Sequence, residues 1–123
     1  MAANGKKSML VVLRHSPYGS SLAKAGLDAV LATAAFSQPV DLLLLGDGVL
    51  QLQPDQDGHR IGQKNIGRQL SSLPLYDINH VYVDAEAVTR YNVDISRAPV
   101  DTRMLDKAEL HQLMAGYDHL LGF

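Results

Sequence analysis

The chain has 123 residues, 46% of them hydrophobic, and eleven lysines and arginines against thirteen aspartates and glutamates give a formal net charge of -2. Scattered basic residues disfavour tight nucleic-acid binding by this chain alone, and no apolar run approaches the roughly 20 residues of a membrane-spanning helix. The absence of cysteine excludes a disulfide, a thiolate zinc site, an iron–sulfur cluster and cysteine-based covalent chemistry on this chain.

The N-terminal residues 1–7 are polar and carry no apolar secretory segment. We expect them to form a disordered extension and the protein to be cytoplasmic. Residues 8–123 contain no internal repeat or linker and are expected to form a single domain.

The first half of the chain has the pattern of a βαβ unit. Residues 9–13 are apolar without alternation, as in a strand that is buried on both faces of a parallel sheet. A Ser/Pro/Gly loop follows, and Ser20 or Ser21 is expected to cap a helix that begins near Leu22. We expect its buried face to contain mainly small residues, and the next strand to span residues 40–45. The residues assigned to the buried face of this helix are Leu22, Ala25, Gly26, Ala29, Val30, Thr33 and Ala34.

The second half continues the alternation of strands and helices. After a polar loop at 53–60, a helix is predicted from Ile61 to Leu73, ended by Pro74. The β-branched and aromatic residues at 80–83 predict a third strand. The remaining expected elements are a helix over 84–91, a connector at 93–99, a short strand at 99–101, a helix capped by Asp106 with Leu110, Leu113 and Met114 along one side, and a last strand within 117–123.

This order predicts a three-layer α/β/α fold with a mainly parallel sheet of four or five strands. In such a sheet, functional groups gather beyond the carboxyl ends of the strands, here the loops at 14–19, 46–48 and 84–85. Gly19 alone is a weak anion-site signal, and the first loop lacks the glycine patterns of dinucleotide and P-loop sites. For the Gly46-Asp47-Gly48 sequence we favour a tight turn over a ligand contact.

The candidate catalytic groups lack a recognisable motif. The serines at 16, 20 and 21 could be combined with His15 and Asp47, but none lies in a Gly-x-Ser-x-Gly elbow, and helix capping explains them more simply. The five histidines contain no i, i+4 pair that would suggest a metal site. The sequence therefore predicts no catalytic residues, no metal and no cofactor on this chain.

Four sequence blocks, in order and at similar spacing, resemble the TusC/DsrF family of DsrE/DsrF-like proteins. The resemblance extends from about Met9 to Phe123. The blocks are Gly26-Leu27-Asp28-Ala29-Val30-Leu31-Ala32, Gly46-Asp47-Gly48-Val49-Leu50-Gln51-Leu52, Leu75-Tyr76-Asp77-Ile78 and Tyr117-Asp118. Arg90-Tyr91-Asn92 departs from the family pattern, in which a basic residue is usually followed by glycine.

The resemblance implies a subunit of a cytoplasmic sulfur-relay complex, assembled with TusB/DsrH-like and TusD/DsrE-like siblings, typically as a dimer of heterotrimers. Such complexes pass persulfide sulfur towards tRNA wobble 2-thiouridine or, in the Dsr branch, serve the oxidation of stored sulfur. The position nearest to the sulfur-carrying cysteine of the sibling is Asp84, and a carboxylate cannot form a persulfide. Asp84 could influence the thiolate of that sibling electrostatically, but a helix N-cap is its plainer role. The resemblance therefore implies a non-catalytic subunit.

A subunit role implies exposed apolar side chains at interfaces. The candidates lie in or beside loops, although each of them could instead belong to the core of the domain: Tyr18, Val49, Leu50, Leu52 and Tyr76. The alternative hypothesis is a stand-alone small-molecule or nucleotide-binding domain that uses the loops at 18–19 and 47–48.

Overall fold

The computed structural model describes residues 8–16, 22–36, 38–53 and 61–123, and within these the side chains of residue 23 and residues 61–66 are not described. Five strands form one all-parallel sheet in the order β4-β3-β2-β1-β5. The strands are β1 (Met9–Leu13), β2 (Val40–Leu44), β3 (Val81–Asp84), β4 (Thr102–Leu105) and β5 (His119–Gly122).

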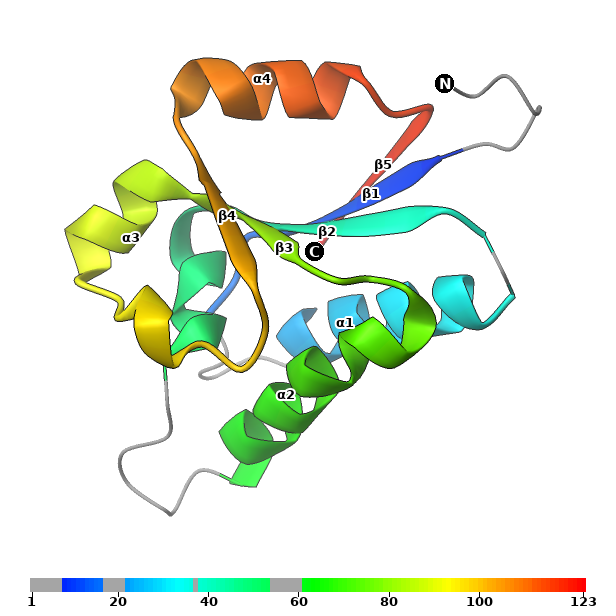
Figure 1. Cartoon of the computed structure of the whole chain (residues 1–123), viewed down its shortest axis with the longest axis horizontal. Coiled ribbons are helices and arrows are strands. Elements are labelled where there is room, and N and C mark those ends of the chain that lie inside the picture. The colour runs from blue at the N-terminus through cyan, green and yellow to red at the C-terminus, as the bar shows by residue number, and fades with distance from the viewer. Residues whose placement is uncertain (1–7, 17–21, 37, 54–60) are drawn as a thin grey trace.

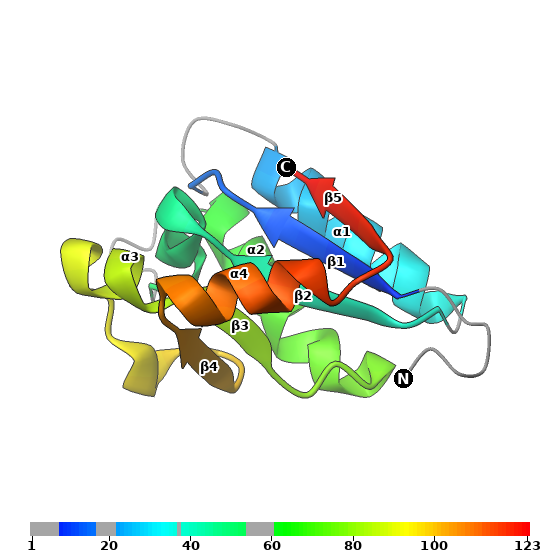
Figure 2. The same cartoon turned by 90° about the horizontal axis from the view of Figure 1, so that it is seen from above.

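The helices cover both faces of this sheet. Helices α1 (Leu22–Ala35) and α2 (Ile61–Ser72) lie on one face, and α4 (Lys107–Ala115) lies on the other (Figures 1 and 2). Helix α3 (Ala85–Tyr91) and the 3-10 helix η2 (Gly46–Leu52) lie beyond the carboxyl ends of β2 and β3 (Figure 1). The three-layer α/β/α prediction is confirmed.

The apolar run in β1 reflects burial on both faces. Val11 and Leu13 belong to the larger core, under α1 and α2, whereas Leu10 and Val12 belong to a smaller core that includes Leu110 of α4. Successive side chains of a strand point to opposite faces, so a strand between two helical layers needs apolar residues at every position.

Strand β2 is paired unevenly with its two neighbours. It pairs with β1 along its whole length, from Met9↔Val40 to Leu13↔Leu44. It pairs with β3 only at Leu43↔Tyr82 and Leu44↔Val83. The first half of β2 therefore faces the 3-10 helix η3 (Leu73–Tyr76) and the segment after it, instead of a strand.

The expectation about the fourth strand was wrong. The fourth strand begins at Thr102, not within 99–101, and the 3-10 helix η4 (Ile95–Arg97) precedes it. Because β4 is an edge strand with exposed Arg103 and Met104, it lacks the continuous apolar pattern by which buried strands are recognised.

On α1, Leu22 and Ala25 are exposed, although we had placed them on the buried face. Leu27 is fully buried. Gly26 faces β1 so closely that a Cβ there would lie 2.0 Å from Cδ2 of Leu13. The buried side of α1 is therefore centred on Gly26, Leu27 and Val30.

Several boundaries agree with the sequence prediction. Asp106 caps α4, and Leu110, Leu113 and Met114 pack on one side of it. Helix α2 ends at Ser72, and Pro74 lies in the first turn of η3. The proposed cap at Ser20 or Ser21, residues 1–7 and the loop residues 54–60 lie outside the described residues. Among the described residues, no helix combines the length and apolar character that crossing a membrane requires.

Candidate functional site

The turn after β2 lies at the carboxyl edge of the sheet, where the parallel strands end. Gly46 has a φ of +55°, which a glycine adopts without strain. At Gly48, a Cβ would lie 2.0 Å from the carbonyl oxygen of Leu13, so only glycine allows η2 to pack against the end of β1. Both glycines are thus explained by the turn itself, as the sequence interpretation favoured.

Asp84 ends β3 and joins two elements of this edge. Its Oδ1 accepts a hydrogen bond of 3.4 Å from the backbone N–H of Ala87, which makes it the N-cap of α3. Its Oδ2 accepts a 3.2 Å hydrogen bond from the N–H of Gly46. Both carboxylate oxygens therefore hold backbone groups of the chain itself.

Asp47 is also engaged within the chain. Its Oδ1 accepts a hydrogen bond from the hydroxyl of Tyr91, at the end of α3. This hydrogen bond is the main reason why the pKa of Tyr91 is raised above its ordinary value. The carboxylate proposed as part of a ligand site or a catalytic triad thus connects η2 to α3, and no hydrogen bond joins it to His15 within the described part of the chain.

A cleft of about 300 Å³ opens between the start of α3 and the side of α4. Leu45, Leu110 and Met114 supply its apolar lining. Asp84 and Glu86 supply negative charge, and Lys107 and His111 bring basic side chains from α4. None of these seven lining residues carries a thiol or a hydroxyl, so the cleft can bind or orient a group but offers no nucleophile of the serine or cysteine type.

Sequence analysis did not identify Lys107 and His111 as members of this site. They are four residues apart on α4, which places them on the same side of the helix. That spacing was visible in the sequence, but its relation to Asp84 depends on where α4 crosses the sheet. Metal binding finds no support in the described ranges, where no three His, Cys, Asp or Glu side chains are placed so that they could hold a metal ion together.

The five interface candidates have different surroundings. Val49 and Leu52 are completely buried in the larger core, so the expectation that they expose apolar surface was wrong. A 3-10 helix has three residues per turn, which places these two side chains together on the inner side of η2. Leu50 is partly buried, Tyr76 is 39% exposed, and Tyr18 lies outside the described residues.

The amino-acid sequence of this chain is similar to those of known proteins over most of its length. The model of the DsrE/DsrF-like family matches residues 7–123. A protein of Pseudomonas aeruginosa named Protein TusC homolog is 32% identical over 115 residues, which cover 94% of this chain and 97% of that protein.

Two solved structures have similar folds at low sequence identity. The ychN protein from E. coli matches with a TM-score of 0.74 and 18% identity, covering 95% of this chain and 99% of that one. A conserved protein of unknown function from Bacteroides thetaiotaomicron, BT1422, matches with a TM-score of 0.69 and 13% identity, covering 100% and 98%. At such identities the likeness concerns the fold alone.

Proposed function

Because this chain belongs to the DsrE/DsrF-like family and is similar to a TusC homolog over almost its whole length, we propose that it is a non-catalytic subunit of a heteromeric sulfur-relay complex. The proposal rests mainly on the sequence similarity to a TusC homolog. The persulfide is formed on a cysteine of a sibling subunit, and this chain shapes and supports that sibling.

The chemistry of the carboxyl edge supports a role without sulfur transfer on this chain. The chain has no cysteine, and the cleft beside Asp84 contains no thiol. Asp84, at the position that we align with the sulfur-carrying cysteine of the sibling, instead holds the N–H groups of Gly46 and Ala87. A helix cap in that place stabilises the edge of the sheet but cannot accept a sulfur atom.

The proposed complex contains this chain together with TusB/DsrH-like and TusD/DsrE-like siblings, as a dimer of heterotrimers in the cytoplasm. It passes persulfide sulfur towards tRNA wobble 2-thiouridine or, in the Dsr branch, serves sulfur oxidation. The near-neutral charge of this chain agrees with a role in which the tRNA is bound elsewhere. Tyr76 and Leu50 remain its proposed interface residues.

The deciding experiment is native mass spectrometry of the chain co-expressed with the two sibling subunits. We expect a stoichiometric hetero-oligomer that contains a cysteine-bearing sibling. Recovery of this chain alone, while the siblings are soluble, would overturn the proposal and favour a stand-alone binding domain.

Replacement of Asp84 by alanine tests its non-catalytic role. We expect Asp84→Ala to lower the stability of the chain by about 1 kcal/mol, because α3 loses its N-cap, and to leave the complex assembled. Persulfide loading of the sibling, measured by intact-mass spectrometry, should persist. Asp84→Asn, which keeps a side-chain oxygen as acceptor, is the matched control, and a complete loss of loading in both variants would give Asp84 a direct role in transfer.

A further inference from the structure

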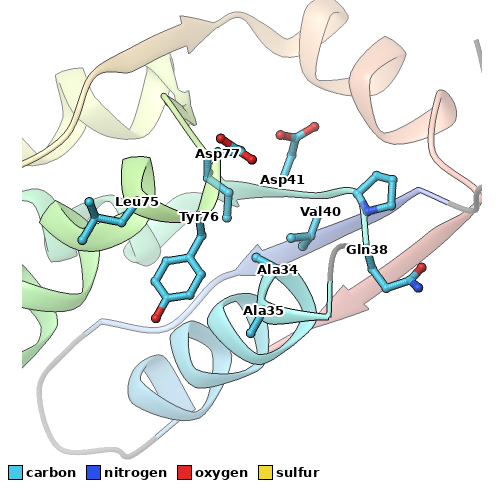
Figure 3. A pocket seen from close by; sticks show the side chains of 10 residues that line it. Ala34, Ala35, Gln38, Val40, Asp41, Leu75, Tyr76 and Asp77 are labelled. Carbon is cyan, nitrogen blue, oxygen red and sulfur yellow. The ribbon is translucent and has the colours of Figure 1, made fainter.

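A groove of about 730 Å³ lies at the amino edge of the sheet, where β2 and β3 are not yet paired (Figure 3). Its walls come from the end of α1, the start of β2 and the end of η3 with the residues that follow it. The groove exists because pairing of β2 with β3 begins only at Leu43, which leaves Val40 and Asp41 beside a 3-10 helix.

The groove combines exposed apolar surface with negative charge. Leu75 is 85% exposed, and the ring of Tyr76 points from η3 towards α1 (Figure 3). Asp41 and Asp77 contribute two carboxylates. None of the ten lining residues is a lysine, an arginine or a histidine, so the charge of the groove is not neutralised by its own walls.

The fold fixes the carboxylate of Asp41 and the backbone of Asp77. Tyr117 donates a hydrogen bond to Oδ2 of Asp41, and a carboxylate has the capacity to accept others. Asp77 ends η3 with a left-handed φ of 66°, and its backbone N–H binds the carbonyl of Pro74 at 3.2 Å. Within the described part of the chain, the side chain of Asp77 has no ion-pair or hydrogen-bond partner.

We propose that this groove docks a sibling subunit, which inserts a lysine or arginine side chain towards Asp41 and Asp77. The carboxylates of Asp41 and Asp77 attract the cationic end of this side chain, while Leu75 and the Tyr76 ring point away from them and offer a separate contact for apolar side chains of the partner (Figure 3). Charge complementarity favours a cationic partner, since an anionic or purely apolar one would leave both carboxylates desolvated and unpaired. The inference rests on the proposed function for the identity of the partner.

Docking here leaves the cleft beside Asp84 accessible. The groove lies at the amino ends of the parallel strands, and the cleft lies at their carboxyl ends. A sibling can therefore be anchored at one edge while the other edge remains free for a second contact, as a supporting subunit requires.

The test measures the affinity of this chain for its co-purified siblings, by titration calorimetry at low and high salt. Asp41→Asn/Asp77→Asn should raise the dissociation constant about tenfold at low salt and remove most of its salt dependence. Tyr76→Ala should weaken binding at both salt concentrations. Asp101→Asn removes a negative charge at the same edge but outside the groove, and should bind like the wild type.

Each contrary result has a distinct meaning. If the wild-type chain binds the siblings and the double variant binds them equally well, the docking site is wrong and the proposed function stands. If the wild-type chain does not bind them at all, both are overturned. If the isolated chain dimerises in sedimentation experiments and Asp77→Lys dissolves the dimer, the groove binds a second copy and the sibling is not its occupant.

Discussion

At the scale of single residues, one tyrosine connects the end of the chain to the middle of the sheet. Tyr117, just before β5, donates a hydrogen bond to Asp41 at the start of β2. Burial and then this hydrogen bond raise the pKa of the Tyr117 hydroxyl above its ordinary value. The folded state therefore holds this proton more tightly than the unfolded state does, which makes stability depend on pH at the alkaline end.

We expect this contribution to be fully present below about pH 10, the ordinary pKa of tyrosine, and to be lost progressively as the pH rises above it. The unfolded chain releases the proton first, so alkaline pH favours unfolding. Urea unfolding at several pH values should show this fall in the free energy of unfolding. Tyr117→Phe should flatten it and cost about 1 kcal/mol at neutral pH.

Tyr76→Phe is the matched control, because it removes a hydroxyl that borders the open groove and that forms no hydrogen bond with Asp41 among the described residues. An alkaline slope in Tyr117→Phe equal to that of the wild type would show that another group causes it.

At the scale of elements, α4 is important because it is the only helix among the described residues that covers its face of the sheet (Figure 2). Its start is well determined: Asp106 accepts from the N–H of Glu109 at 2.8 Å, and Glu109 accepts from the N–H of Asp106 at 3.0 Å. This reciprocal capping box satisfies two backbone donors at the end of β4. The sequence analysis expected the cap at Asp106, and the structure adds Glu109 as its reciprocal partner.

We expect Asp106→Ala to lower the free energy of unfolding by about 1 kcal/mol and to increase hydrogen exchange in α4. The smaller core, with Leu10, Leu43 and Leu110, should be affected before the larger one because α4 is its cover. Asp94→Ala removes the cap of the short η4 and serves as the comparison. An equal effect of both substitutions would mean that α4 is not the more sensitive element.

At the scale of the whole molecule, the surface matters most because a subunit is defined by its contacts. Among the interface candidates, Tyr76 borders the acidic groove, while Leu50 is partly buried and packs against the larger core. Val49 and Leu52, its neighbours on η2, are fully inside. Leu50 is therefore the candidate on η2 whose substitution can report on assembly.

We expect Leu50→Glu to weaken assembly with the siblings, because a charge at an apolar contact must be desolvated on binding. Native mass spectrometry gives the size of the complex, and thermal unfolding of the isolated chain separates an interface effect from loss of the fold. Leu50→Ala is the milder control. An unchanged complex in Leu50→Glu would remove this residue from the interface.

Much of the architecture was predictable from the sequence because its causes are local. The unbroken apolar runs of β1 and β2, the caps at Asp84 and Asp106 and the helix between the first two strands all depend on neighbouring residues. Family membership was predictable for a related reason: the four blocks keep their order along the chain, and the family comparison confirmed the resemblance.

The relation between distant segments was decided only by the tertiary structure. Three features involve residues that are far apart in the chain. They are the placement of β5 beside β1, the inward orientation of Val49 and Leu52, and the cleft that Lys107 and His111 share with Asp84. The groove at the amino edge arises because β2 and β3 pair over two residues only. Hydrophobic periodicity reports which residues are buried, but the pairing of strands depends on which distant surfaces fit together.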